Sequence, residues 1–278
     1  MNTKKVWLVT GASKGLGFSL IKRLLNEGYK VVATSRTVES LEKEIESSAD
    51  FLPLEVNLTD EHSVTNAIST AIKTFGGIDV IVNNAGYIQF GTLEELSDEE
   101  ARQNFDINVF GALNVIRNVM PHFRHKKSGH IINVSSIAGL IGTFPGCGIY
   151  CATKYALVGL TESLSTEVKE FGVNATIVYP GYFRTNFLNK GSVSHPQQPI
   201  EAYTSARHSE QWHETEMKGK QLGNPDKAAE AFIQLAESAH PPLHFIMGSD
   251  AFGMTYNKIE MLQSELAANE ALSKSTDF

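Results

Sequence analysis

The stretch Thr10-Gly-Ala-Ser-Lys-Gly-Leu-Gly17 decides the fold of this chain. It follows the short apolar run Val6–Val9 directly and leads into an amphipathic segment that we expect to be a helix. A glycine-rich turn between a strand and a helix is typical of a phosphate site at the helix N-terminus. Here Gly11 allows a tight turn, Gly15 lets the backbone approach a pyrophosphate, and Gly17 lets the helix pack closely on the strand.

Short apolar runs alternate with longer amphipathic segments along the rest of the chain. The runs predicted to be strands are Val6–Val9, Lys30–Thr34, Phe51–Glu55, Val80–Asn83, His130–Ser135, Asn174–Tyr179 and His244–Met247. The predicted helices are Leu16–Glu27, Glu39–Ser47, Glu61–Phe75, Asp98–Lys127, Tyr150–Phe171, Pro225–Glu237 and a surface helix from Tyr256 that frays near Ser273. We therefore expect an α/β fold, a doubly wound parallel sheet (Rossmann fold) of about seven strands with helices on both faces.

The composition predicts one soluble domain over residues 1–278. Hydrophobic residues make up 42% of the 278 residues, and no linker, repeat or low-complexity run divides them. The net charge of −7 argues against nucleic acid or an anionic membrane as a partner. Only Val6–Val9 follows Lys4 and Lys5 before a polar residue, which is too short for a signal peptide, so we expect a cytoplasmic protein.

The cysteines and histidines do not predict a metal site. Cys147 and Cys151 are too few for a disulfide framework or a cysteine-only zinc site, and free thiols are expected. His195, His208 and His213 lie in a polar segment without a matching Asp or Cys pattern, so we interpret them as solvated side chains.

The end of the second predicted strand predicts the nucleotide. Chains that bind NAD usually carry an acid there, about 20 residues past the glycines, to hold the ribose 2′-hydroxyl. This chain reads Ala33-Thr-Ser-Arg36, with Ser35 at the acidic position and Arg36 after it. Lys14 in the glycine turn can approach the same region. Two cations without a competing carboxylate favour a 2′-phosphate, so we predict NADP(H).

Tyr150 and Lys154 are the candidate catalytic pair. At i and i+4 near the start of a predicted helix, both project from one face. Lowering the pKa of a tyrosine from about 10 to about 7 requires roughly 4 kcal/mol of stabilisation of the phenolate. An ammonium about 4 Å away, at an effective dielectric constant of about 20, supplies energy of that order. Tyr150 is therefore predicted to be a general acid in reduction and a general base in oxidation.

Two further polar residues are expected beside this pair. Ser136, at a strand end, can donate a hydrogen bond to the substrate oxygen where charge develops, and Ser135 is the alternative because the two point in opposite directions. Asn108 lies inside a long predicted helix although asparagine is a poor helix former, which suits a residue that holds a water in a proton relay.

Taken together, these motifs resemble the short-chain dehydrogenase/reductase family over Lys5 to about Thr185. The resemblance implies a catalytic tetrad of Asn108, Ser136, Tyr150 and Lys154, with Lys154 also on the nicotinamide ribose. It implies that Asn83 to Gly86 support the sheet and line the adenosine side, and that Pro180 to Thr185 hold the nicotinamide. Many relatives carry Asp where this chain has Asn57, which can still reach the adenine. The residues expected to bind the cofactor are Gly11, Ser13, Lys14, Gly15, Leu16, Gly17, Ser35, Arg36, Asn57, Leu58, Asn83, Ala85, Gly86, Tyr150, Lys154, Pro180, Gly181, Phe183 and Thr185.

We therefore predict an NADP(H)-dependent oxidoreductase of the carbonyl reductase or alcohol dehydrogenase type. The resemblance places a substrate lid at about 186–223, and an apolar substrate is expected from the candidate pocket walls Leu140, Phe144, Cys147, Tyr182, Phe183 and Phe187. It also implies a homodimer or homotetramer through helices 98–127 and 150–171, with Ala156, Leu157, Leu160 and Leu164 as apolar contacts. A redox sensor that binds NADP(H) without turnover is the alternative function. A lyase, epimerase or dehalogenase on the same fold is a third hypothesis, which the glycine turn and Lys154 do not favour.

Overall fold

The computed structural model describes residues 4–188 and 191–278. The strands are β1 (Val6–Val9), β2 (Lys30–Ser35), β3 (Phe51–Glu55), β4 (Val80–Asn83), β5 (Ile88–Gln89), β6 (Gly129–Val134), β7 (Val173–Pro180), β8 (Val193–Ser194) and β9 (His244–Met247). The α-helices are α1 (Gly15–Asn26), α2 (Glu39–Glu42), α3 (Glu61–Phe75), α4 (Asp98–Phe105), α5 (Gly111–Lys126), α6 (Gly148–Glu167), α7 (Thr204–Gln211), α8 (Pro225–Glu237) and α9 (Ser249–Lys274). Short 3₁₀ turns are η2 (Ile137–Gly139), η3 (Lys169–Phe171) and η4 (Asn186–Leu188), and π-helical turns are η1 (Asp106–Phe110) and η5 (Trp212–Glu216).

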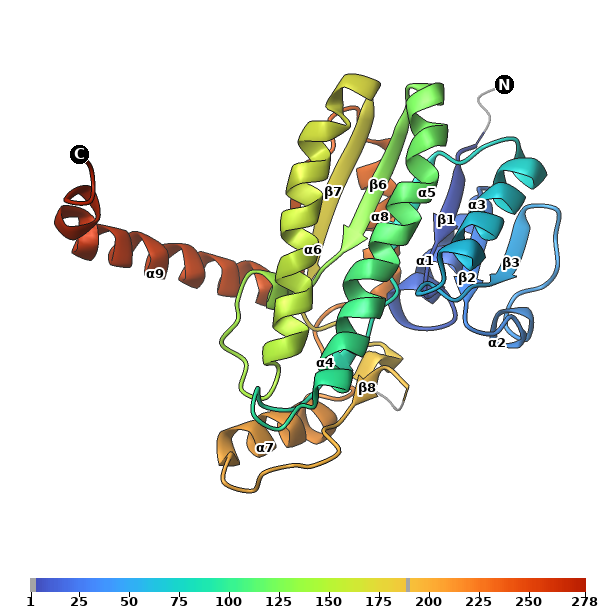
Figure 1. Cartoon of the computed structure of the whole chain (residues 1–278). Coiled ribbons are helices and arrows are strands. Elements are labelled where there is room, and N and C mark those ends of the chain that lie inside the picture. Colours follow the sequence, from blue (N-terminus) through green and yellow to red (C-terminus); the bar gives the residue numbers. More distant parts are fainter. Residues whose placement is uncertain (1–3, 189–190) are drawn as a thin grey trace.

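Seven strands form one parallel sheet in the order β3-β2-β1-β4-β6-β7-β9 (Figure 1). β1 lies between β2 and β4, with Val9 in register with Ala33 on one side and Val82 on the other. The strand order reverses at β1, and the chain enters β4 on the opposite side. The predicted doubly wound α/β sheet is confirmed, and its reversal point is where such sheets bind ligands.

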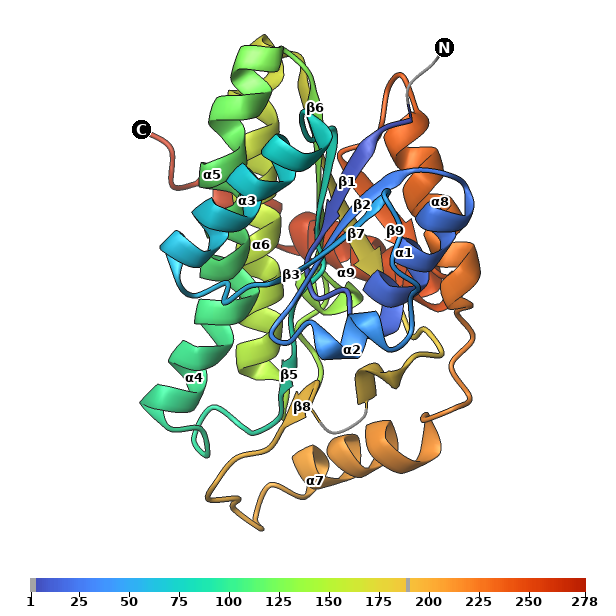
Figure 2. The same ribbon diagram turned by 90° about the vertical axis from the view of Figure 1, so that its right-hand side faces the viewer.

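Helices cover both faces of the sheet, as the edge-on view in Figure 2 shows. Successive residues of a strand point to opposite faces, so Trp7 and Val9 pack in the core beneath α1 and α8 while Leu8 packs in the core beneath α3 and α5. The apolar runs of the sequence correspond to strands buried on both sides. Leu157 and Leu164 of α6 are also buried, so they belong to the interior rather than to the expected subunit interface.

The carboxyl ends of the strands meet at one edge of the sheet, and a small second layer lies beyond that edge. β5 and β8 pair there in parallel, and α7 lies below them (Figure 2). This arrangement brings residues 186–223, apart from 189–190, which lie outside the described residues, over the end of the sheet. The segment is the one expected to be the substrate lid.

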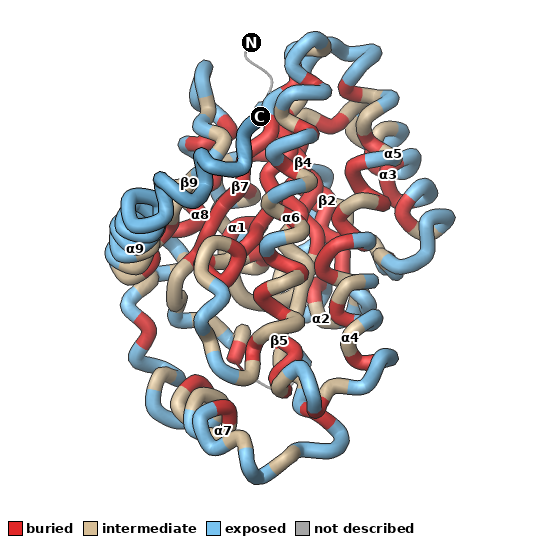
Figure 3. The backbone as a smooth tube through the Cα atoms, turned by 60° about the vertical axis from the view of Figure 1, so that its left-hand side comes forward, coloured by how far each residue is buried: buried red, intermediate tan, exposed pale blue. Residues whose placement is uncertain are grey.

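Three helices differ from the expected bounds. The predicted helix 39–47 has only the four residues of α2, and the predicted helix 98–127 contains a π-helical turn at Asp106–Phe110. α9 begins at Ser249 rather than near Tyr256, because Gly248 stands at its N-cap after the last strand. Along this 26-residue helix only Ala251 is buried, and Figure 3 shows it extending from the body as an exposed arm.

Within the described ranges, none of the helices has the length and apolar character needed to cross a membrane.

Candidate active site

A cavity of about 520 Å³ runs along the carboxyl edge of the sheet. Its walls come from the glycine turn, from the ends of β2, β4, β6 and β7, from the first turns of α6 and from the segment after β7. All of the residues expected to bind the cofactor line it except Gly17 and Asn83. The fold therefore gathers motifs that are far apart in the sequence around one space.

The glycine turn forms an open cradle at one end of this cavity. Gly11 and Gly15 have φ angles of +61° and +62°, a backbone region that residues with a Cβ rarely adopt. A Cβ on Gly11 would lie 2.7 Å from Ala85 Cα, so only glycine fits there. α1 begins at Gly15 without a side-chain cap and without an acidic residue in its first turn. Its N–H groups and positive dipole end are thus suited to a pyrophosphate.

The segment after β4 supports this turn, and here the prediction needs a correction. A Cβ on Gly17 would meet Asn84 Nδ2 at 2.5 Å, and that amide donates to the carbonyls of Thr10 and Gly11 at 2.9 and 3.1 Å. Asn83 instead donates to Asn133 Oδ1 at 2.8 Å inside the sheet. Because Asn83 faces β6 rather than the cavity, Asn84 is the residue that shapes the cofactor end.

Two cations gather at the end of β2. Lys14 and Arg36 both line the cavity, and burial together with the positive charge of Arg36 lowers the pKa of Lys14. Ser35, which precedes Arg36, is buried and carries no charge. Glu55 pairs with Ser35 in strand register but does not line the cavity. This end is therefore suited to a phosphate group beside the ribose.

Asn57 lines the cavity at the position expected for the adenine. Its Oδ1 accepts hydrogen bonds from Thr59 N at 3.1 Å and from Thr59 Oγ1 at 2.8 Å. The oxygen holds the turn after β3, so only the Nδ2 donors of this side chain could serve an adenine.

Tyr150 lies buried in the middle of the cavity, hydrogen-bonded to Ser136. Ser136 Oγ also accepts from Ala138 N at 3.1 Å, whereas Ser135 Oγ donates to the carbonyl of Lys154 at 3.0 Å. Of the two serines left open by the sequence, Ser136 is thus the one beside the phenol. Ser135 instead fastens α6 to the end of β6.

The electrostatic expectation for Tyr150 is wrong in direction. Lys154 Nζ lies 5.8 Å from the centroid of the Tyr150 ring. Burial raises the pKa of Tyr150, although the hydrogen bond with Ser136 lowers it. The phenol therefore stays protonated at neutral pH, the form that donates a proton.

Lys154 is buried beneath the turn that holds Gly86. Its Nζ donates to the carbonyl of Val134 at 2.9 Å, and a Cβ on Gly86 would come within 3.4 Å of that nitrogen. Burial lowers the pKa of Lys154 to about 8. An ammonium held in this way sits between the end of β6 and the turn after β4, where a ribose hydroxyl could reach it.

Asn108 holds the framework around the pair. Its Oδ1 accepts from Tyr87 N at 3.0 Å, and its Nδ2 donates to Tyr87 O and to Thr153 Oγ1, both at 3.0 Å. Thr153 Oγ1 in turn donates to the carbonyl of Tyr150 at 2.8 Å. Both N–H groups of Asn108 Nδ2 are engaged, and the side chain joins the turn after β4 to the first turn of α6. The π-helical turn around it is a feature often found at functional sites.

The far end of the cavity is apolar. A buried cluster there contains Ile88, Phe90, Ala138, Cys147, Tyr150, Cys151 and Leu188, with Phe144, Phe187 and Val193 packed against it. Phe144, Cys147, Tyr182, Phe183 and Phe187 line the cavity as expected, whereas Leu140 does not. This end can take an apolar group beside the Tyr150 hydroxyl.

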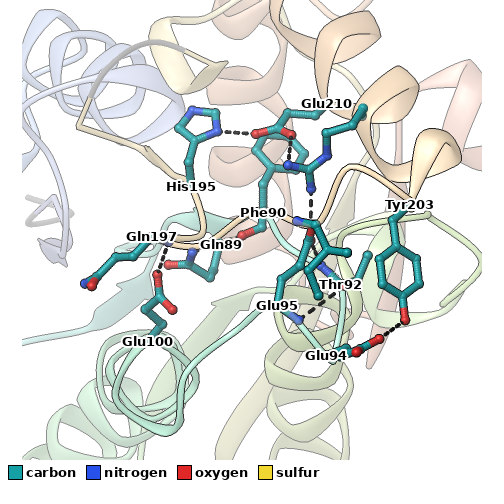
Figure 4. A network of polar contacts seen from close by, with 12 residues as sticks. Gln89, Phe90, Thr92, Glu94, Glu95, Glu100, His195, Gln197, Tyr203 and Glu210 are labelled. Carbon is teal, nitrogen blue, oxygen red and sulfur yellow. Dashed lines mark hydrogen bonds and ion pairs between the residues drawn. The ribbon is translucent and has the colours of Figure 1, made fainter.

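The segment over this end is fastened by buried carboxylates (Figure 4). Glu95 accepts hydrogen bonds from Ile200 N at 2.7 Å and from Arg207 Nη2 at 2.9 Å, and Glu100 accepts from Gln197 N at 2.9 Å. His195 pairs with Glu210 at the surface. The segment is thereby anchored to the loop after β5 through Glu95 and to the first turn of α4 through Glu100.

His213 differs from its expected solvated state. It is buried, lines the cavity and bonds to the Tyr182 hydroxyl through Nε2 at 2.9 Å. The prediction holds better for His195 and His208, which are exposed. Among the described residues no group of His, Cys, Asp and Glu is arranged to hold a metal ion, and both cysteines are free and buried.

Sequence reasoning missed several residues that hold the site. Asn84 stands beside the predicted Asn83 in the same motif. Thr153 lies inside the motif Tyr150-Cys-Ala-Thr-Lys154, but helical periodicity alone does not mark it as a functional residue. No local signal marks His213, because its partner Tyr182 is 31 residues away.

Comparisons with known proteins agree with this geometry. A family model described as short chain dehydrogenase matches residues 5–194. The chain is 32% identical over 267 residues to Oxidoreductase BOA17 of Botryotinia fuckeliana, which covers 94% of each chain. The crystal structure of a short-chain dehydrogenase from Streptomyces avermitilis covers 100% of both chains, with a TM-score of 0.90 and 32% identity.

Two other solved structures contain nicotinamide nucleotides. A short chain dehydrogenase from Burkholderia cenocepacia in complex with NADP is 26% identical, with a TM-score of 0.72 over 96% of this chain and 97% of that one. A 3-ketoacyl-(acyl-carrier-protein) reductase from Brucella melitensis complexed with NADH is also 26% identical, with a TM-score of 0.71 over 88% and 96%.

Proposed function

The chain belongs to the short-chain dehydrogenase/reductase family of oxidoreductases, and we propose that it transfers a hydride between NADP(H) and a carbonyl compound or secondary alcohol. One observation carries the proposal. Buried Tyr150, hydrogen-bonded to Ser136 and one helical turn from buried Lys154, lines the same cavity as the glycine cradle. Similar solved structures contain NADP or NADH, and the phosphate groups of such a nucleotide suit the glycine cradle of this chain.

The residues divide the work as follows. The nicotinamide, when bound, supplies or accepts the hydride. Tyr150 donates its proton to the substrate oxygen in reduction, and Ser136 hydrogen-bonds that oxygen as charge develops on it. Lys154 stabilises the phenolate that remains and offers N–H donors to the ribose. Burial favours the protonated form of Tyr150, so we propose that the enzyme without substrate holds this side chain in the form that reduction requires.

We propose NADP(H) rather than NAD(H) as the cofactor. Lys14 and Arg36 supply two positive charges at the end of β2, and Ser35 leaves the ribose position without a competing acid. Arg36 can bind a 2′-phosphate in bidentate fashion, while Lys14 acts as a point charge. The substrate is proposed to be apolar near its carbonyl group, since Phe144, Phe187 and the buried cluster around Tyr150 surround that end.

The test follows NADPH and NADH absorbance at about 340 nm with aryl ketones, diketones, steroids and aliphatic aldehydes. Reduction with NADPH is expected, and Tyr150→Phe should lower kcat/KM by about 10²–10⁴-fold, the usual contribution of general acid catalysis. Tyr256→Phe makes the same chemical change on exposed α9 and serves as the control. NADPH binding without turnover of any carbonyl would support the redox-sensor alternative instead.

We further propose that the chain is a homodimer or homotetramer. Beside the α5 and α6 face, where Phe110 and Tyr155 are exposed, the arm α9 exposes Phe252, Ile259, Leu262 and Leu266 along one side. These residues recur at spacings of three, four and seven, the spacing of a helix that packs on another helix. In an antiparallel pair of α9 helices centred on Ile259, Lys258 faces Glu260 of the second copy. Light scattering should give a particle mass of two or four times 30.5 kDa. Ile259→Glu should lower this mass if α9 forms the contact, and Tyr155→Glu should lower it if α6 does.

A further inference from the structure

The apolar end of the cavity contains a polar corner that the proposed reaction does not use. Tyr182, His213 and Gln221 all line the cavity there, although they come from three separate segments. His213 and Gln221 are 7% and 2% exposed, so their polar atoms face the interior rather than bulk water. Buried polar groups in a cavity wall require hydrogen-bond partners.

The direction of the hydrogen bonds in this corner follows from His213. Its Nδ1 lies 2.7 Å from the carbonyl of Ser209, which can only accept, so Nδ1 carries the proton. Burial lowers the pKa of His213, and the neutral ring therefore presents Nε2 as an acceptor. The Tyr182 hydroxyl, 2.9 Å from Nε2, donates its hydrogen to that atom. The Tyr182 oxygen keeps its lone pairs for a further donor.

Aromatic packing fixes this orientation. The His213 ring lies edge-on to Trp212 at 5.0 Å and next to Phe90 at 5.7 Å between ring centroids. Tyr182 also stands edge-on to Trp212, at 5.7 Å. These ring contacts and the bond to His213 fix the Tyr182 hydroxyl, so its acceptor oxygen is preorganised.

Gln221 also lines the cavity, and its side-chain amide offers a second acceptor. Its Oε1 has no hydrogen-bond partner among the described residues and is closed to solvent in this structure, so a substrate donor meets it once the amide turns towards the cavity. The backbone of its segment pairs with that of Tyr182, since Gly223 N donates to Tyr182 O at 2.9 Å and Arg184 N donates to Gly223 O at 2.8 Å. Arg184 Nη2 donates to the Gln221 main-chain carbonyl at 3.1 Å and so helps to hold this segment.

We propose that Tyr182 Oη and Gln221 Oε1 form a subsite for a hydrogen-bond donor on the substrate, a hydroxyl or an N–H group placed away from the carbonyl that Tyr150 protonates. The inference rests on the proposed function and narrows its substrate class to hydroxyl- or amino-bearing carbonyl compounds. Two acceptor oxygens disfavour a carboxylate at this position, so simple keto acids are poor substrates. A site with a buried acceptor also discriminates against the analogue that lacks the donor.

The Tyr182 corner lies close enough to Tyr150 for one substrate to reach both. The charge of a Tyr182 phenolate would raise the pKa of Tyr150, and Cys147 acts electrostatically on both phenols. Tyr182, Tyr150 and Cys147 therefore surround one portion of the cavity.

The test uses an unsubstituted aliphatic methyl ketone and congeners of the same chain that carry a hydroxyl at successive carbons. For wild type, NADPH-dependent kcat/KM should be about tenfold higher for one hydroxyl position than for the unsubstituted ketone, the effect of one or two hydrogen bonds. Gln221→Leu and Tyr182→Phe should each bring this ratio towards one. Gln234→Leu on the exposed face of α8 and Tyr256→Phe on α9 are the matched controls and should keep the wild-type ratio.

Calorimetric binding of the same ketones separates the two proposals. Two outcomes would overturn the subsite and leave the proposed reaction standing. One is turnover without preference for any hydroxyl position, and the other is an equal loss of kcat/KM for all ketones in Gln221→Leu and Tyr182→Phe. A binding preference that Gln221→Leu removes, without turnover, would support the subsite and overturn the reaction. Gln221→Leu should also keep or raise the melting temperature, because it replaces an acceptor that has no partner with an apolar group; a marked fall would show that Oε1 is satisfied within the protein and would overturn the proposal.

Discussion

Lys154 Nζ donates a hydrogen bond of 2.9 Å to the carbonyl of Val134, and only 4% of the Lys154 surface is exposed. Burial lowers the pKa of this ammonium to about 8 from the ordinary lysine value of 10.5. The unfolded chain therefore binds more protons than the folded chain between about pH 8 and pH 10.5, and stability rises with pH across that window.

Replacing Lys154 with methionine should separate activity from stability. Lys154→Met should lower kcat/KM for reduction by about 10²-fold or more, because the phenolate of Tyr150 loses its nearest cation. It should also stabilise the fold by roughly 3 kcal/mol at neutral pH, since no charge is then buried. Urea unfolding from about pH 7 to pH 10 measures both effects, and the rise of stability with pH should be missing in the variant. Equal stability of the two proteins at pH 7 would contradict the buried ammonium.

Wild-type reduction should depend on the same proton. The kcat/KM for NADPH-dependent reduction should fall as the pH rises through about 8, because Lys154 becomes neutral there. The kcat/KM for oxidation of the alcohol should instead rise with pH. The base in that direction is the Tyr150 phenolate, and burial raises the pKa of Tyr150, so this form becomes more populated as the pH increases. If kcat/KM for reduction stays constant between about pH 7 and about pH 9, the range around this pKa, then a group other than Lys154 controls the pH dependence.

Thr153 should act on catalysis through the backbone of Tyr150. Thr153→Val leaves one N–H of Asn108 Nδ2 without an acceptor and the Tyr150 carbonyl without its side-chain donor, and we expect a loss of about 2 kcal/mol of stability. We also expect kcat to fall about tenfold with little change in the KM for NADPH, because the phenol loses its fixed position. Thr153→Ser keeps the hydroxyl and should restore both. Thr65→Val on exposed α3 is the control.

The positions of the strands could be predicted because both faces of this sheet are covered. Strands such as β1 and β4 read as unbroken apolar runs, and polar or glycine residues follow each of them. Since parallel strands end at one edge, the motifs after them had to meet, and Gly11, Ser136 and Tyr150 do line one cavity. Local pattern and topology are sufficient for these elements.

Burial and long-range pairing explain what the sequence could not show. The two-residue strands β5 and β8 pair across more than a hundred positions and have no periodicity. The raised pKa of Tyr150 depends on how deeply α6 is covered, which no spacing of residues reveals. The same holds for His213, whose polar neighbours in the sequence suggest exposure although its side chain packs against Phe90.

The nucleotide preference should depend on Ser35 and Arg36. Ser35→Asp places a carboxylate where a 2′-phosphate would bind, so kcat/KM with NADPH should fall by about 100-fold while that with NADH rises. Arg36→Ala should weaken NADPH by about tenfold and leave NADH nearly unchanged. Arg124→Ala at the exposed end of α5 controls for the loss of a charge. Wild-type preference for NADH would mean that Lys14 and Arg36 are surface charges only.

His130 should make the fold sensitive to acid. It is buried in β6 with Nε2 at 2.9 Å from Thr176 Oγ1, and burial, with a smaller effect of Lys5, lowers its pKa to about 4. The unfolded histidine binds a proton near pH 6.5, so stability falls as the pH drops from about 6.5 to about 4, by roughly 3 kcal/mol. His130→Gln should remove this part of the pH dependence, whereas His208→Gln at the surface should not. The measurement is the difference in urea unfolding between wild type and each variant across that window.

The carboxylate of Glu95 should hold the proposed lid closed over the apolar end of the cavity. Burial disfavours its charge, but hydrogen bonds from Thr92 N and Ile200 N and the Arg207 guanidinium outweigh burial and lower its pKa. Glu95→Gln cannot accept all of these bonds, so we expect a loss of about 3 kcal/mol, faster proteolysis within 191–217 and a higher KM for substrate than for NADPH. In wild type this contribution is present above about pH 4.5 and is lost as the pH falls below it. Glu94→Gln, on an exposed neighbour that bonds only to Tyr203 among the contacts in Figure 4, should leave the proteolysis rate and the KM unchanged. Cleavage that is equally slow in the Glu95 variant would mean that the segment is held by its aromatic contacts rather than by this carboxylate.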